Sequence, residues 1–172
     1  WEGPHLYWYT IGQTLTPQER APAPEQPAVV LLTSEELSHQ PELPGLERTL
    51  HHTPPARDAR VCKAEVRSDC LAGTLVLPRQ GKDGKPLACG YLVTGTRVVL
   101  VDDESALQGL LRRIAREKRW TNGSVGRFLY DFFEQLIARD LHRIEKIEDR
   151  IEALEDQVLA VSYTHLRAHE TE

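Results

Sequence analysis

The chain has 172 residues, enough for one domain and an additional long element. Its 26 acidic residues outnumber 21 basic ones, and the net charge of −5 argues against nucleic-acid binding, which requires a basic face. No run of about twenty apolar residues is present, so the sequence predicts no membrane span. The three cysteines are scattered without a CxxC pair, which indicates a reducing compartment rather than a disulfide or zinc framework.

The sequence also lacks the patterns that accompany catalysis. No nucleophile–base pair and no cofactor motif is recognisable. Gly81 and Gly84 lack the spacing and the following helix that a phosphate-binding loop needs. We therefore expect that the chain is not an enzyme.

Short β-branched and aromatic segments predict a β-sheet. They are Leu6–Ile11, Ala28–Leu32, Arg60–Val66, Gly73–Leu77, Ala88–Val93 and Arg97–Val101. The last is a nearly continuous apolar run and is expected at the centre of the sheet, after a tight hairpin turn at Thr94–Thr96. The strands from Arg60 onward are expected to form an antiparallel meander, and the proline-rich stretch from Thr16 to Pro27 is expected to be a loop.

Two segments carry the signals of a helix N-terminus. Thr33 and Glu36 have the spacing of a capping box, and Ser105 and Gln108 repeat it. A basic cluster follows the second box and suits the negative end of the helix dipole, with an anionic membrane surface as the alternative partner. Its members are Arg112, Arg113, Arg116, Lys118 and Arg119.

The segment from Ser124 to Ala160 predicts one long helix. It has no proline, no glycine after Gly126, and apolar residues at three- and four-residue steps. At about 1.5 Å per residue the helix would be about 55 Å long, so we expect it to project from the domain and to require a partner. As far as Leu141 its apolar face is wide and aromatic, which is typical of packing on a domain core.

From Ile144 onward the apolar residues narrow to a coiled-coil seam of about two heptads. The seam residues are Ile144, Ile147, Ile151, Leu154 and Val158. With Ile144 at position a, Arg143 and Arg150 occupy g, while Glu148 and Glu155 occupy e. In parallel helices each g residue faces the e residue of the next heptad on the neighbouring chain, so these charges favour a parallel homo-oligomer. The alternative is a single helix packed on its own domain.

At this point the sequence resembles CorA-type magnesium transporters. The similarity lies in an "L..IE..ID.LE..VL" run that matches the start of the family's stalk helix, preceded by the strand-to-helix order RVVLVDDESALQGLLRRI. The residues that carry the run are Leu141, Ile144, Glu145, Ile147, Glu148, Ile151, Leu154, Glu155, Val158 and Leu159. The strand Ala28–Leu32 followed by TSEEL also resembles the early part of divergent bacterial members.

The resemblance implies a fold of class α+β with α/β-type layering. It consists of a mixed, largely antiparallel β-sheet flanked by helices and followed by one long projecting stalk helix. We expect a cytosolic domain at residues 1–123, the stalk helix at 124–160 and a non-native tail at 161–172, because this tail loses the helical period and resembles a translated sequencing adaptor. The chain starts at Trp1 and contains no methionine, so we also expect a fragment of a longer reading frame.

The implied function is that of a regulatory cytosolic domain in a homopentameric divalent-cation transporter, on the cytoplasmic side of the cell membrane. Magnesium is the expected ion, with cobalt and zinc as alternatives. The family's pore helix, Gly-Met-Asn signature and second membrane helix are not in this sequence, so nothing here conducts an ion. The alternative function is a soluble coiled-coil interaction module without transport.

An acidic stripe on the long helix is the candidate metal site. It contains Glu145, Glu148, Asp149, Glu152 and Glu155. Carboxylate oxygens suit Mg²⁺, and carboxylates that cluster between protomers repel each other unless a cation intervenes. One interpretation is an inter-subunit regulatory Mg²⁺ site, to which Asp102 and Asp103 at a strand end would contribute; the alternative is a solvated acidic face without a metal.

Overall fold

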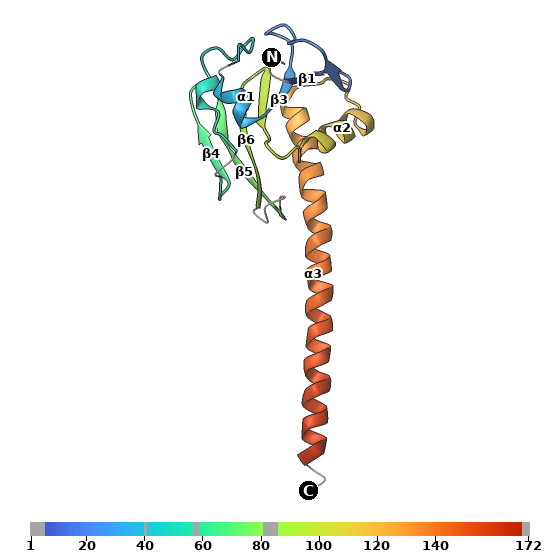
Figure 1. The fold of residues 1–172 in the computed structure, drawn as a ribbon. Coiled ribbons are helices and arrows are strands. Elements are labelled where there is room, and N and C mark those ends of the chain that lie inside the picture. The colour runs from blue at the N-terminus through green and yellow to red at the C-terminus, as the bar shows by residue number, and fades with distance from the viewer. Residues whose placement is uncertain (1–5, 40, 57–58, 81–85, 170–172) are drawn as a thin grey trace. The chain divides into compact units, whose positions relative to one another are not determined.

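The computed structural model describes residues 6–39, 41–56, 59–80 and 86–169, with the backbone alone described at 78–80, 139, 140, 143 and 161–169 (Figure 1). The chain divides into two compact units: unit 1 extends to Gln135, and unit 2 begins at Leu136. Unit 1 contains the β-sheet, its covering helices and the start of the long helix. Unit 2 is the remainder of that helix.

Seven strands of the described residues form one mixed sheet in the order β2-β1-β3-β7-β6-β5-β4. The strands are β1 Tyr7–Ile11, β2 Leu15–Gln18, β3 Ala28–Leu32, β4 Lys63–Val66, β5 Leu71–Gln80, β6 Pro86–Val93 and β7 Arg97–Val101. β3 and β7 pair in parallel at the centre, and the other neighbouring pairs are antiparallel. Every residue of β3 and β7 is buried, as expected for apolar runs covered on both faces. The predicted mixed sheet, with β7 at its centre, is confirmed.

The sheet contains one strand that the sequence did not indicate. β2 includes Pro17, which cannot donate a backbone hydrogen bond, and its residues after Leu15 are exposed. It is tolerated because β2 is an edge strand, paired only with β1 through contacts such as Tyr9 opposite Pro17. The prediction that the loop begins at Thr16 was therefore wrong by three residues.

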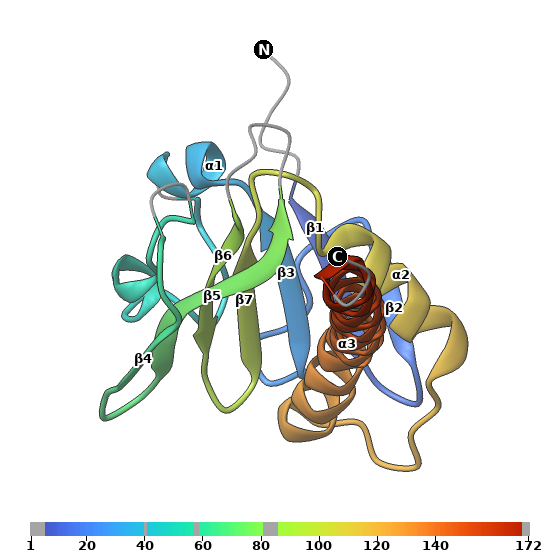
Figure 2. The ribbon, with the colours of Figure 1, turned by 90° about the horizontal axis from the view of Figure 1, so that it is seen from below.

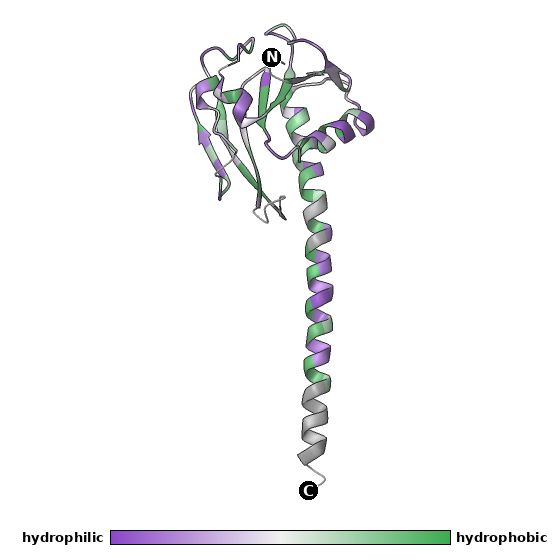
Figure 3. Cartoon of the chain, in the orientation of Figure 1, coloured by the Kyte–Doolittle hydropathy of each residue, from purple (hydrophilic) through white to green (hydrophobic). Residues whose placement is uncertain are grey.

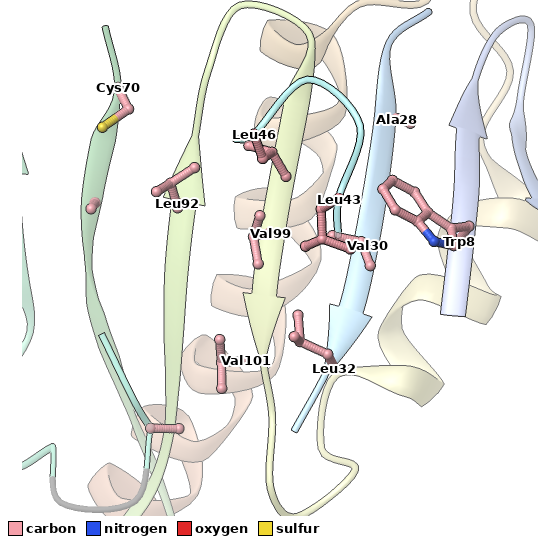
Figure 4. Close-up of a cluster of buried hydrophobic side chains, with 12 residues drawn as sticks. Trp8, Ala28, Val30, Leu32, Leu43, Leu46, Cys70, Leu92, Val99 and Val101 are labelled. Carbon is pink, nitrogen blue, oxygen red and sulfur yellow. The ribbon is translucent and has the colours of Figure 1, made fainter. Parts of the chain in front are cut away.

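One face of the sheet packs against a cluster of buried side chains that includes Trp8, Val30, Leu92 and Val99 (Figure 4). Leu43 and Leu46, from the segment that follows helix α1 (Ser34–Ser38), close this cluster over the central strands. The short 3-10 helix η1 (Leu50–His52) continues the segment.

Arg97 fixes two irregular segments to this face. It is fully buried and lies 5.7 Å from the Trp8 ring centre. Its guanidinium donates to the carbonyl of Pro44 at 3.0 Å, to those of Pro22 and Ala23 at 2.9 and 2.7 Å, and to that of Gln26. Burial lowers the pKa of Arg97, and these carbonyls compensate the charge that burial would otherwise leave unsolvated.

The opposite face is covered by helix α2 (Gln108–Glu117) and by the first turns of helix α3 (Val125–His169), as Figure 2 shows. Leu111 and Ile114 of α2 and Phe128 and Phe132 of α3 are fully buried or nearly so. Leu136 is also buried, whereas Phe133 is 39 % exposed and Ile137 and Leu141 are more than half exposed, so the face predicted to pack as far as Leu141 is buried only in part.

The capping prediction at α1 is confirmed. The Glu36 amide donates to the Thr33 hydroxyl, and the Thr33 amide donates to the Glu36 carboxylate at 2.7 Å. The prediction at α2 was wrong. Ser105 has a left-handed backbone with φ 57°, and α2 begins only at Gln108 without a side-chain cap.

The Asp102 carboxylate, and not Ser105, binds the backbone amides just before α2. It accepts from the amides of Leu107 at 2.7 Å and Glu104 at 3.2 Å. Its neighbour Asp103 accepts from the Ser34 amide and hydroxyl at 2.6 and 2.8 Å. Both carboxylates therefore organise the connections of unit 1 rather than facing an open metal site.

Candidate functional site

The residues predicted to form a coiled-coil seam lie on α3, and their side chains are exposed. In unit 2 the side chains of these five residues are 51–68 % exposed. Their apolar character recurs along one side of the helix in Figure 3. Contiguous apolar residues of this kind are rarely left exposed unless they form an interaction surface. We call this set (Ile144, Ile147, Ile151, Leu154 and Val158) the seam.

The seam continues in both directions along the helix. Ile137 and Leu141 precede it and Leu159 follows Val158, and all three are more than half exposed. An isolated helix gains little from such residues, because the stability of helices in proteins comes mainly from packing an apolar face. The seam is therefore a candidate self-association surface.

The acidic stripe lies beside the seam on the same helix. Within the described residues Glu148, Asp149, Glu152 and Glu155 form no salt bridge, and Glu145 contacts only His142, whose Nδ1 lies 3.4 Å from its carboxylate. Glu148 and Glu155 flank the seam at position e, whereas the other three lie farther round the helix. Within the described side chains, the stripe therefore has a single pairing, that of Glu145 with His142.

No three His, Cys, Asp or Glu side chains in the described part of the chain are grouped so as to hold a metal ion. One helix spreads the stripe along its length, so the carboxylates of a single chain do not converge. The side chain of Arg143, the first g residue, lies outside the described residues. The predicted inter-subunit metal site and the g–e ion pairs both require a second chain, so they stay predictions.

A buried carboxylate that the sequence did not indicate fixes the first turns of α3 within unit 1. Asp131 is 1 % exposed and accepts from the Trp120 indole Nε1 at 2.6 Å. Lys118 Nζ lies 3.1 Å from its other oxygen, and Arg127 Nε lies at 3.6 Å. Lys118 also pairs with Glu134, and this pairing together with that to Asp131 raises the pKa of Lys118.

This Asp131 cluster determines how α3 leaves the sheet. Trp120 lies in the connection between α2 and α3, and Asp131 lies on the buried face of α3, so the bond between them ties this connection to the first turns of the helix. The signal in the sequence is an aspartate inside an aromatic run, FLYDFF, eleven residues after a tryptophan.

The α3 helix is longer than predicted. Its backbone remains helical to His169, so the prediction that the helical pattern ends at Ala160 was wrong. Within the described residues no helix is both long enough and apolar enough to cross a lipid bilayer.

Comparison with known proteins finds likeness in structure rather than in sequence. No protein-family model matches the chain, and no curated protein matches it. The soluble domain of CorA from Methanocaldococcus jannaschii superposes with a TM-score of 0.65 at 16 % identity, over 90 % of this chain and 64 % of that one. The chain shares its fold with the soluble domain of CorA. The predicted resemblance to CorA-type transporters is thus confirmed in the fold.

Two longer proteins show the same likeness to the CorA fold. The complete CorA magnesium transporter from Methanocaldococcus jannaschii matches with a TM-score of 0.64 at 14 % identity, over 90 % of this chain and 51 % of that one. The full-length CmaX protein matches with a TM-score of 0.65 at 15 % identity, over 93 % and 54 %. This chain therefore spans about half the length of these full-length relatives of the CorA fold.

Proposed function

We propose that the chain is the cytosolic regulatory domain of a CorA-like divalent-cation transporter, with magnesium as its ion. The observation that carries this proposal is the likeness to the CorA soluble domain over 90 % of the chain, which includes α3 as well as the sheet. The relatives in this fold are ion transporters rather than enzymes, in keeping with the lack of a catalytic motif. Pore and membrane helices would be supplied by a longer protein of which this domain is a part.

In this proposal the domain works as a symmetric oligomer held by the seam. Burying five apolar side chains per helix against neighbours removes the exposure that α3 shows alone. Isoleucine at both a and d favours more than two strands, in keeping with a homopentamer. Arg143 would meet Glu148 of the next chain, and Arg150 would meet Glu155.

Cation control would enter through the acidic stripe. Parallel association brings carboxylates of neighbouring helices together, and Mg²⁺ favours oxygen ligands of this kind. Bound Mg²⁺ would therefore stabilise the associated state, whereas its loss would restore repulsion and loosen the helices. This couples ion concentration to subunit packing, because a ligand shifts an equilibrium only through differential affinity for its states.

The test is sedimentation velocity of the chain with and without magnesium. We expect magnesium to shift the chain to a larger, closed oligomer, and this shift to be lost in the double variant Glu148→Gln, Glu155→Gln. The double variant Glu19→Gln, Glu42→Gln is the matched control, because it removes two exposed carboxylates of unit 1 and should respond as the parent does. A magnesium response that survives neutralisation of Glu148 and Glu155 would contradict the stripe as the regulatory site.

The second candidate is a soluble coiled-coil interaction module, which the exposed seam supports equally. Such a module would associate through the seam without any response to magnesium. The same experiment separates the two, because only the cation-sensing domain changes its assembly when magnesium is added.

A further inference from the structure

A groove in unit 1 lies apart from α3, between α2 and the β1–β2 edge of the sheet. It has a volume of about 500 Å³ and is lined by Tyr7, Tyr9, Pro17, Gln108, Arg112 and Arg116. Figure 2 shows α2 lying beside β2, with which it makes its main tertiary contacts. This volume falls within the range of small-molecule sites in proteins.

The groove carries positive charge that the described residues neutralise only in part, through Arg116. Arg112 and Arg116 lie one turn apart on the same side of α2, and no carboxylate lines the groove. Arg112 forms no salt bridge within the described residues, and Arg116 pairs only with its exposed neighbour Glu117 at 2.8 Å. Like charges four residues apart destabilise a helix. An anion placed between the two guanidinium groups would remove this cost.

A tyrosine hydroxyl faces the same charge. Tyr9 lines the groove, and its hydroxyl forms no hydrogen bond within the described part of the chain. Burial of the residue raises the pKa of Tyr9, and the nearby positive charge of Arg112 partly offsets this rise. The hydroxyl therefore offers a free donor beside Arg112.

The rest of the lining is flat and apolar. Tyr7 is 47 % exposed at the outer strand end, and Pro17 of β2 lies across from the arginines of α2. Guanidinium groups bind phosphate oxygens bidentately, and exposed aromatic faces stack on nucleobases. A ligand that uses both parts must have a phosphate and a planar ring within one small molecule.

We propose that this groove binds a nucleoside phosphate, with the phosphates on Arg112 and Arg116, the Tyr9 hydroxyl donating to a phosphate oxygen, and the base stacked on Tyr7. This is a ligand site separate from the seam and from the acidic stripe, and it stands whether or not α3 associates.

Isothermal titration of the chain with ADP in the presence of a chelator tests the proposal, because removal of divalent cations separates this site from cation sensing. We expect saturable binding of one ADP per chain. Arg112→Gln should weaken it about tenfold through loss of a charge-assisted bidentate contact. Arg113→Gln removes an equal charge from the same helix outside the groove lining and should bind as the parent does.

Two further measurements locate the parts of the ligand. Tyr9→Phe keeps the ring and should weaken ADP binding several-fold by removing only the hydroxyl. Tyr7→Ala should weaken ADP but leave pyrophosphate binding unchanged, because pyrophosphate has no base to stack. Thermal unfolding of each variant without ligand confirms that the exposed substitutions leave the fold intact.

The proposal is overturned if ADP does not bind, or if Arg113→Gln weakens binding as much as Arg112→Gln, which would indicate general charge attraction. It is also overturned if pyrophosphate binds the parent as tightly as ADP. Binding to phosphatidylglycerol vesicles but not to ADP would assign the basic face of α2 to a membrane surface instead.

Discussion

The apolar residues of the central strands in unit 1 are buried, whereas those of the seam in unit 2 are exposed. In β3 and β7 every residue is buried, including Arg97, whose charge is met by backbone carbonyls. In unit 2 every residue of the seam is at least half exposed, and within the described residues the carboxylates of the acidic stripe pair only with His142.

This difference indicates which of the two units should be stable in a single chain. In unit 1 the central strands are buried and the buried charges of Arg97, Asp102 and Asp131 have partners within the unit, so its stability should be a property of the single chain. Unit 2 has the apolar pattern of an interface but no partner, so its stability should depend on chain concentration. Substitutions should therefore lower the stability of unit 1 most in its buried core and least in the seam.

The core at the start of α3 should respond most strongly. Phe132→Ala removes a 1 % exposed ring and should lower the free energy of unfolding by about 4 kcal/mol, through lost burial and the cavity that remains. Phe133→Ala, at the next position but 39 % exposed, is the matched control and should cost much less. Urea unfolding measures both, and equal losses would show that α3 does not pack on the sheet as described.

The Asp131 cluster should rank second. Asp131→Asn keeps the shape but removes the charge that Trp120, Lys118 and Arg127 share, and it should cost about 2 kcal/mol. Glu134→Gln, on the exposed side of the same lysine, should cost less than about 1 kcal/mol. If the two variants unfolded alike in urea, Asp131 would not anchor the helix.

The Asp102 carboxylate should give a smaller, pH-dependent effect. Burial raises its pKa above the ordinary aspartate value, so the folded state holds this proton to higher pH than the unfolded state does. Its contribution to stability is therefore present at acidic pH and is lost as the pH rises through the raised pKa. Asp102→Asn should flatten this part of the stability–pH curve at a cost of about 1 kcal/mol. A curve identical to that of the parent would exclude Asp102 as its source.

Substitution of the seam should change the unfolding of unit 1 least of all. Ile147→Ser with Ile151→Ser should leave that transition within about 0.5 kcal/mol, because both side chains belong to unit 2 and are more than half exposed. Sedimentation should instead show loss of any oligomer that the parent forms. Lys146→Ser with Ala153→Ser, outside both the seam and the acidic stripe, is the control that should keep the oligomer. Loss of the oligomer in this control alone would show that the interface uses another face of α3.

Local patterns in the sequence were enough to predict the central sheet and the first helix cap. β3 and β7 are uninterrupted apolar runs, and Thr33 with Glu36 forms its box within one turn. The exposed apolar residues of α3 were also predictable, because their period of three and four belongs to the helix alone; their role as an interface stays a prediction.

Features that join distant segments were missed. β2 exists because β1 pairs with it, although Pro17 argues locally against a strand. Asp102, which directly follows β7, accepts an amide hydrogen bond just before α2 in place of Ser105, and Ser105 has a left-handed backbone instead. Tyr9 and Arg112 line the same groove although about a hundred residues separate them in the sequence, and no local pattern predicts that they lie close together.

The buried position of Arg97 has a consequence for how the chain folds. Its distant carbonyl partners lie between 53 and 75 residues earlier in the sequence. Until both irregular segments reach β7, the guanidinium must stay in water, because burial without these acceptors is strongly unfavourable. Closure of the two segments and completion of the central parallel pair should therefore occur together, as a single step set by long-range contacts rather than by local propensity.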